Sequence, residues 1–240
     1  MTGLFLQAFN VILYQPLFNS LVLLYQFLPG NDFGVAIIVL TILIRLMLFP
    51  LMNQSLKAQK VLSKTQEKIK DIQKKYKENK EKQMKAMIEL YQKEKINPYA
   101  SLIPLFIQLP LLIALYRVFW NGLEPESLNL LYSFVPGPQT INPFFLGILD
   151  LSLPSWVLAV LSGTLQFLQS KQLSPGQKSQ DKISEIMSQQ MLYFFPIVTV
   201  FILLRLPSAV ALYWIITILF SMAQQQLINK STLACSKEKI

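Results

Sequence analysis

The chain has 240 residues, of which 52% are hydrophobic and only 15% are charged, and this composition excludes an ordinary soluble protein. It carries 22 basic and 13 acidic residues, no histidine and a single cysteine, Cys235. An intramolecular disulfide, a Cys/His metal cluster, a Cys–His nucleophile pair and a histidine proton relay are therefore all excluded. We expect a membrane protein that is not an enzyme and that needs no metal or cofactor.

The first apolar segment, residues 4–28, is interrupted by several polar side chains and by Pro16. This mixture favours a helix lying in the membrane interface over a helix that spans the bilayer. Five later segments have the length of about 20 residues that crosses ~30 Å of hydrocarbon. The predicted spans are residues 34–56, 99–120, 151–172, 190–206 and 208–228.

A lysine-rich segment, residues 57–98, separates the first two spans. Its apolar or large residues recur at spacings of three and four from Leu62 to Tyr76, and they resume from Met84 to Tyr91. Two antiparallel amphipathic helices forming a hairpin are typical of this pattern. The alternative is a pair of solvated helices whose lysines only set topology and touch anionic lipid.

The lysines indicate the orientation of the chain. All nineteen lie in three places: thirteen in residues 57–95, three in 171–182 and three in 230–239. The segment 121–150 has no basic residue. The positive-inside rule therefore places the lysine-rich segments in the cytoplasm and the amino terminus outside. The basic excess then reflects topology, and a specific nucleic-acid partner is not needed to explain it.

Arg45 differs from the other two arginines. Arg117 and Arg205 lie near the outer ends of their spans and can reach the headgroups. Arg45 lies eleven residues from either end of its span, about 16 Å, which is beyond the reach of its side chain. The spans contain no carboxylate to pair with it. Either backbone carbonyls and hydroxyls such as Thr41 satisfy Arg45, or Arg45 lines a hydrated groove and awaits an anionic group; we favour the groove.

Polar residues of the other spans are candidates for the same groove, and the indole of Trp214 offers an amphipathic wall. Each of them can also serve as ordinary interhelical contact. The candidates are Gln108, Gln166, Gln169, Thr199, Thr217 and Gln224.

Four stretches, in order, resemble the YidC family of membrane-protein insertases, which has relatives in mitochondria and thylakoids. They are Leu43-Ile44-Arg45 followed by Pro50, the stretch from Leu90 to Pro98, the stretch from Pro104 to Pro110, and the run from Leu206 to Trp214 that ends in Gln224-Gln225-Gln226-Leu227-Ile228. The resemblance covers about residues 34–228. Arg205 departs from it, since family members often carry an apolar or aromatic residue there.

The resemblance implies a five-helix core around a hydrophilic groove that opens to the cytoplasm and to lipid, with an amphipathic helix on the outer surface. Matched by motif, the groove arginine, glutamine and tryptophan of the family correspond to Arg45, Gln169 and Trp214. We add Gln108, Thr41 and Thr217 to this substrate-binding groove. Client helices are expected to slide along the second and fourth spans.

The expected protein is thus an all-α polytopic membrane protein of the bacterial cytoplasmic membrane, with its carboxyl terminus inside. Its parts are an outer interfacial helix and linker (1–33), the five-span core (34–56 and 99–228), a cytoplasmic helical hairpin (57–98) and a short basic tail (229–240). Expected partners are nascent membrane proteins, anionic lipids and, through the hairpin, a Sec translocon, a ribosome or a targeting receptor.

Two other functions fit the same residues. A lone buried arginine would also suit a secondary transporter or channel for a small anion, although no intramembrane acid or histidine is present for ion coupling and no paired halves are detectable. An assembly factor or chaperone that holds spans without inserting them has no distinguishing sequence feature.

Overall fold

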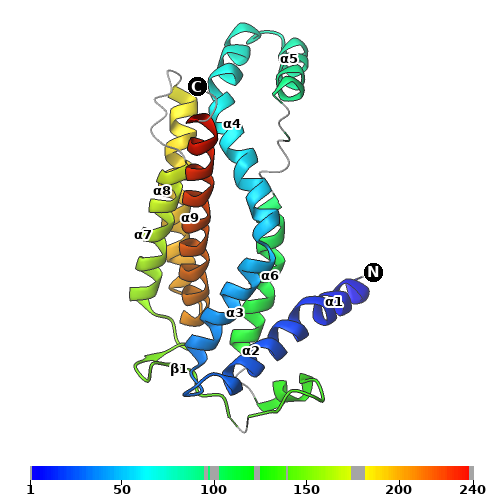
Figure 1. Ribbon diagram of the computed structural model, residues 1–240, viewed down its shortest axis with the longest axis vertical. Helices are drawn as coiled ribbons and strands as arrows, with labels where there is room; N and C mark the ends of the chain where they lie inside the picture. Colours follow the sequence, from blue (N-terminus) through cyan, green and yellow to red (C-terminus); the bar gives the residue numbers. More distant parts are fainter. Residues whose placement is uncertain are drawn as a thin grey trace. The chain divides into compact units, whose positions relative to one another are not determined.

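The computed structural model of the chain describes residues 2–94, 97, 103–121, 125–138, 140–173 and 182–237. In these ranges the chain is mostly α-helical, as predicted, with one short antiparallel pair of strands (Figure 1). The helices are α1 (Thr2–Phe9), the π-helical turn η1 (Asn10–Tyr14), α2 (Gln15–Phe27), α3 (Phe33–Met47), α4 (Phe49–Lys75), α5 (Lys80–Lys93), α6 (Ile103–Asn121), the 3₁₀ turn η3 (Pro125–Leu130), α7 (Trp156–Leu173), α8 (Lys182–Leu203) and α9 (Ser208–Lys237). The strands are β1 (Phe144–Phe145) and β2 (Leu149–Asp150).

The chain forms two compact units, which are described separately. The first unit comprises Met1–Met47 and Gln108–Ala223, and the second comprises Leu48–Ile107 and Gln224–Ile240.

The first unit is built around buried apolar side chains of α2, α3, α6 and the start of α9. Phe33, at the start of α3, makes edge-on ring contacts with Tyr25 of α2 and with Phe119 of α6, at 6.4 and 6.3 Å between ring centroids. Both are geometries that aromatic pairs prefer. The aromatic contacts therefore hold three helices together at the start of α3.

Polar side chains of α2 bind the backbone of the segment that follows η3. Asn19, which is 3% exposed, donates from Nδ2 to the carbonyl oxygen of Leu130 at 3.1 Å and accepts from the N–H of Tyr132 at 2.6 Å. Further along α2, Gln26 donates to the carbonyl oxygen of Pro136 at 3.1 Å. These bonds satisfy backbone groups of the loop that would otherwise lack partners.

The β1–β2 hairpin is fixed against the start of α3. Asp32 accepts the N–H of Leu146 through one carboxylate oxygen and caps α3 by accepting the N–H of Val35, at 2.9 Å, through the other. Phe145 lies against Gly34 so closely that a Cβ on that glycine would come within 2.2 Å of the phenyl ring. Only a glycine admits this close approach without a shift of the ring.

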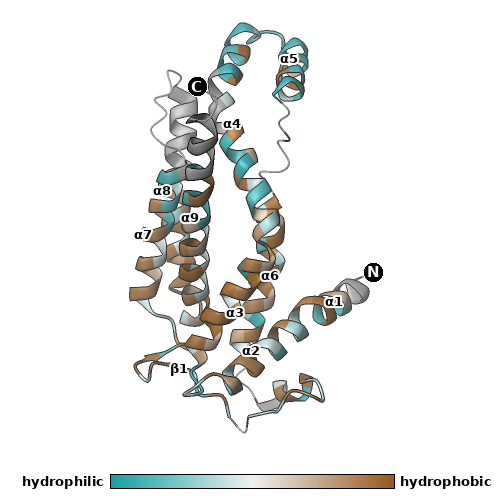
Figure 2. Ribbon diagram, viewed as in Figure 1, coloured by the Kyte–Doolittle hydropathy of each residue, from teal (hydrophilic) through white to brown (hydrophobic). Residues whose placement is uncertain are grey.

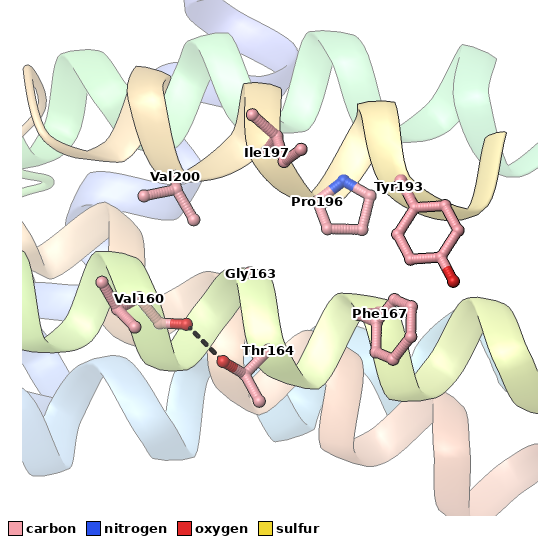
Figure 3. Close-up of a pocket in the computed structure, with 8 residues that line it drawn as sticks. All are labelled: Val160, Gly163, Thr164, Phe167, Tyr193, Pro196, Ile197 and Val200. Carbon is pink, nitrogen blue, oxygen red and sulfur yellow. Dashed lines mark hydrogen bonds between the residues drawn. The ribbon is translucent and has the colours of Figure 1, made fainter. Parts of the chain in front are cut away.

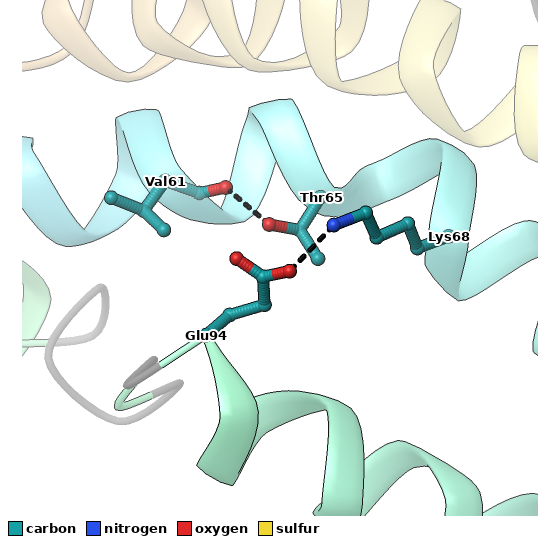
Figure 4. Close-up of polar contacts among 4 residues, drawn as sticks. All are labelled: Val61, Thr65, Lys68 and Glu94. Carbon is teal, nitrogen blue, oxygen red and sulfur yellow. Dashed lines mark hydrogen bonds and ion pairs between the residues drawn. The ribbon is translucent and has the colours of Figure 1, made fainter.

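The second unit contains α4, α5 and the last part of α9. Lys68 of α4 and Glu94, which caps the end of α5, form an ion pair with 2.5 Å between Nζ and Oε1 (Figure 4). Thr65 and Ile69 of α4 are buried, as the spacing of apolar residues predicted. On α5, by contrast, Met84 and Ile88 are 66% and 49% exposed, so these two side chains do not form the buried seam that the pattern indicated.

By length and hydropathy alone, two helical stretches of the described residues are able to cross a membrane, and a third is added if α3 and the first part of α4 count as one span. The two are Leu6–Phe27 and Ser208–Asn229. Two shorter apolar stretches, Phe106–Trp120 and Leu192–Leu203, accompany them. Figure 2 shows α3 as mainly hydrophobic, whereas α5 is mainly hydrophilic. The presence of several apolar helices agrees with a multi-pass membrane protein.

Two predicted boundaries differ from the structure. The first predicted span, 34–56, is interrupted at Leu48, and α4 then runs without a break past Leu56. Pro50 has no N–H to donate to the carbonyl of Leu46, which favours an interruption there. The third predicted span starts at Leu151, but α7 starts at Trp156 because residues 149–154 form β2 and a turn. The predicted boundaries at Pro98 and Tyr99, and the last three residues of the tail, lie outside the described residues.

Candidate functional site

Arg45 lies in the last turn of α3 and is 6% exposed. Its Nη2 donates to Oε1 of Gln108 on α6 at 2.9 Å. Its Nε is buried and has no hydrogen-bond partner in the described part of the chain. Among the residues that the structure describes, no carboxylate lies within ion-pair distance of the guanidinium. The positive charge of Arg45 is therefore bound by a neutral amide and is not compensated.

The hydrogen bond of Arg45 continues to a third helix. Nε2 of Gln108 donates to the hydroxyl of Tyr213 on α9 at 2.9 Å, and Tyr213 is 1% exposed. The chain Arg45–Gln108–Tyr213 thus links α3, α6 and α9 through two hydrogen bonds. Two of the predicted groove residues, Arg45 and Gln108, are brought into direct contact by this arrangement.

Trp214 follows Tyr213 on α9 and contacts a different helix. Its indole Nε1 donates to Oε1 of Gln166 on α7 at 3.1 Å. Consecutive residues of α9 therefore bind polar side chains of α6 and of α7. The indole N–H is satisfied and Trp214 is half-buried, which leaves part of the ring surface accessible.

The other predicted groove residues show three different situations. Thr41 is 1% exposed, and its hydroxyl donates to the carbonyl oxygen of Ile37 at 2.6 Å; no hydrogen bond joins it to Arg45. The hydroxyl of Thr217, one helical turn after Tyr213 on α9, is buried and has no hydrogen-bond partner among the residues that the structure describes. Gln169 on α7 is half-buried, and its amide makes no hydrogen bond to the described residues.

The remaining polar candidates are buried in different surroundings. Thr199 of α8 is 8% exposed. Gln224, in the second unit, donates to the carbonyl oxygen of Phe49 at 3.1 Å and to Oδ1 of Asn53 at 2.9 Å. Because both of its amide hydrogens bind α4, Gln224 acts as interhelical contact between α9 and α4.

An open cleft of about 290 Å³ lies between α7 and α8 (Figure 3). Its walls are mainly apolar, and its two hydroxyl-bearing residues are Thr164, whose hydroxyl donates to the carbonyl oxygen of Val160 at 2.9 Å, and Tyr193. Gly163 lines the cleft at a close approach of the two helices, since a Cβ there would come within 2.3 Å of the side chain of Val200. None of the six predicted groove residues lines this cleft.

The two other arginines differ from each other. Arg117 donates to Oδ1 of Asn10 at 2.8 Å, and its guanidinium lies 4.7 Å from the ring centroid of Tyr14, so it binds η1 by a hydrogen bond and a cation–π contact. Arg205 is exposed, and its side chain has no partner among the described residues.

In the second unit, the ion pair with Lys68 displaces the pKa of Glu94. The hydrogen bond and the charge of Lys68 lower the pKa of Glu94 from its ordinary value of 4.5. Elsewhere on α5, the exposed Met84 and Ile88 are one turn apart on one face, and the exposed Lys85 forms an ion pair with Glu81. The helix therefore presents both apolar and charged side chains.

Tyr213 is the residue of the site that sequence reasoning missed. A tyrosine in the run from Leu206 to Trp214 has no feature that separates it from an ordinary core residue. The sequence feature that could have identified Tyr213 is its position one helical turn before Thr217, which was already a groove candidate.

The comparisons with known proteins agree on one family. The model of the family described as "60Kd inner membrane protein" matches residues 23–235. A protein named "Membrane protein insertase YidC" from Geobacter metallireducens is 31% identical over 93% of this chain and 38% of its own length. "Membrane protein insertase YidC 1" of Listeria monocytogenes is 35% identical over 83% of this chain and 65% of its own length. The chain therefore spans between about two fifths and two thirds of these relatives.

Proposed function

We propose that this chain, which belongs to the 60Kd inner membrane protein family, is a membrane protein insertase that receives hydrophobic client segments and releases them laterally into the bilayer. The observation that carries the proposal is the buried guanidinium of Arg45, whose only described partner is the neutral amide of Gln108. A membrane protein retains such a costly charge where it has a use for it.

The proposed membrane core has five spans, formed by α3 with the first part of α4, by α6, α7 and α8, and by α9. The nineteen lysines lie in segments that the positive-inside rule assigns to the cytoplasm, so the amino terminus is proposed to be outside and the carboxyl terminus inside. The proposed location is the bacterial cytoplasmic membrane.

The segment from α1 to α2 is proposed to lie along the outer interface rather than to cross the membrane, although Leu6–Phe27 is long and apolar enough to span. Gln15 and Gln26 are eleven residues apart, about 16 Å of helix, and both donate to the backbone of residues 130–136. A helix that crosses the bilayer would carry the two glutamines to different depths. Bonds to one short loop without basic residues favour an orientation along the surface.

In the proposed mechanism, Arg45, Gln108, Thr41, Gln169, Trp214 and Thr217 line a hydrophilic groove open to the cytoplasm. Water and the guanidinium replace part of the hydration that a hydrophilic client segment would lose in hydrocarbon, which lowers the barrier to its translocation. Partition of the apolar client span into lipid supplies the driving force. The membrane potential adds ~2.3 kcal/mol per 100 mV for each acidic charge that moves outward.

The helices α4 and α5 are proposed to form a cytoplasmic hairpin that receives clients or the machinery that delivers them, such as a translocon, a ribosome or a targeting receptor. The exposed Met84 and Ile88, flanked by lysines, support this role because apolar side chains on a polar helix favour contact with a partner. The same lysines attract anionic lipid headgroups.

The function is tested by reconstituting the purified chain into liposomes and measuring insertion of a small client with a short acidic translocated tail. We expect insertion above that of empty liposomes, a strong loss for Arg45→Ala and substantial activity for Arg45→Lys, which retains the charge. Arg205→Ala is the matched control, since this arginine is exposed and its side chain has no described partner. Insertion no greater than in empty liposomes would refute the function.

A further inference from the structure

The orientation of the Gln108 amide is dictated by Arg45. A guanidinium only donates hydrogen bonds, so the atom of Gln108 that faces Arg45 must be the amide oxygen. The amide nitrogen then points the other way and donates to the hydroxyl of Tyr213. A tyrosine hydroxyl can donate or accept, so Tyr213 does not select this orientation, but its hydrogen bond holds the amide in place.

The arrangement does not give Arg45 the partner that would stabilise it most. A glutamate at position 108 would have nearly the same shape and would form a charge-assisted hydrogen bond with the guanidinium. The amide instead leaves the charge of Arg45 uncompensated, and Nε of Arg45 stays buried without an acceptor. The neutral partner fixes the side chain in place without cancelling its charge.

We propose that Gln108 and Tyr213 are positioning residues, which hold the guanidinium of Arg45 in one orientation and keep its charge available to acidic client segments. This inference rests on the proposed insertase function. Gln108 acts directly on Arg45, whereas Tyr213 acts through Gln108 by fixing the amide. The preference of the protein for acidic over neutral translocated segments is then set by all three residues.

The test uses the full chain in liposomes and two clients that differ only in the translocated tail, one with three aspartates and one with three asparagines. The quantity measured is the ratio of acidic to neutral client inserted. Gln108→Glu should lower this ratio at least about tenfold, because the new carboxylate neutralises Arg45. Folding of the variant is checked separately, by thermal unfolding of the purified protein in detergent micelles.

Three further variants separate positioning from a general loss of structure. In the Arg45→Ala background, Gln108→Glu should have no additional effect on the ratio, since the two residues act as one unit. Tyr213→Phe and Gln108→Met remove a hydrogen bond without adding charge, and each should lower the ratio by only about threefold. Gln226→Glu adds the same carboxylate at an exposed position of α9 and should leave the ratio unchanged.

The outcomes distinguish this inference from the proposed function. If the unmodified chain inserts both clients but Gln108→Glu leaves the ratio unchanged, the positioning role is wrong and the insertase function stands. An equal fall of the ratio with and without Arg45 would also overturn it, because the carboxylate would then repel the acidic tail directly. If the unmodified chain inserts neither client, both the positioning role and the insertase function are overturned.

Discussion

Replacement of Asn19 by alanine should destabilise the contact between α2 and the loop after η3. The side chain of Asn19 is 3% exposed and makes three hydrogen bonds. Its Nδ2 donates to the carbonyl oxygens of Gln15 at 2.8 Å and Leu130 at 3.1 Å, and its Oδ1 accepts from the N–H of Tyr132 at 2.6 Å. Alanine removes all three bonds and leaves the backbone of the loop with fewer partners.

The three bonds do not contribute equally. The carbonyl of Leu130 keeps the side chain of Gln15 as a donor at 3.1 Å, and the carbonyl of Gln15 belongs to a helix. The N–H of Tyr132 loses the partner that the structure gives it, and because this N–H is only part-buried, its loss costs less than the about 3 kcal/mol that a fully buried unsatisfied donor can cost. With the smaller loss at Leu130, we expect the free energy of unfolding to fall by about 1–2 kcal/mol.

The assay is denaturant unfolding of the purified protein in detergent micelles, with amide hydrogen exchange of the loop measured alongside. Gln26→Ala is the matched control, because it removes a single bond at the surface and should cost no more than about 0.5 kcal/mol. Exchange at Tyr132 should accelerate in Asn19→Ala and remain slow in Gln26→Ala. Equal unfolding free energies for the two variants, with unchanged exchange at Tyr132, would refute the reasoning.

Three further predictions concern other parts of the chain. Gly163→Ala should lower the free energy of unfolding by about 1–3 kcal/mol, because the new Cβ would lie 2.3 Å from Val200. The control is Thr164→Ala at the exposed neighbouring position, which should change the free energy of unfolding little. Equal effects of the two variants in a thermal unfolding scan would contradict the close contact of α7 and α8. Lys68→Met should return the pKa of Glu94 toward 4.5 in an NMR titration, and an unchanged pKa would exclude the ion pair. Because the pKa of Glu94 is lowered in the folded chain, the ion pair should stabilise the α4–α5 contact at pH values above the ordinary pKa. This stabilisation should be lost as the pH falls through the lowered pKa of the folded chain. Cysteines introduced at the exposed positions Ser133 and Asn79 should be labelled from outside and inside intact cells respectively, and the reverse accessibility would overturn the proposed orientation.

Counting residues placed Arg45 in the middle of an apolar segment, which favoured burial, but α3 ends two residues after Arg45, so its burial in the structure depends on helix packing. The partner of Arg45 was not predictable. Gln108 was a candidate among several, and its pairing depends on how α3 packs against α6, which no spacing within one helix encodes. The role of Tyr213 was unpredictable for the same reason, since its hydroxyl contacts Arg45 only indirectly, through the amide of Gln108.

The helix boundaries show a different limit of sequence reasoning. Hydropathy marks where a segment is apolar, whereas α3 ends because of backbone hydrogen bonding near Pro50, and α7 begins after Pro154 where Ser155 can cap it. These proline and serine signals were present in the sequence. On α5, Met84 and Ile88 fit a helical apolar pattern, but such a pattern does not specify whether another part of the chain covers that face.

The central claim, that clients contact a positively charged groove beside Arg45, is tested most directly by site-specific photocrosslinking during arrested insertion. A photoreactive residue at Trp214 should crosslink to the acidic tail of the client, and Arg45→Ala should reduce the yield. Trp156, which is 70% exposed at the start of α7, is the matched control and should give little crosslinking. Equal yields at the two positions, or a yield at Trp214 that is independent of Arg45, would contradict the account.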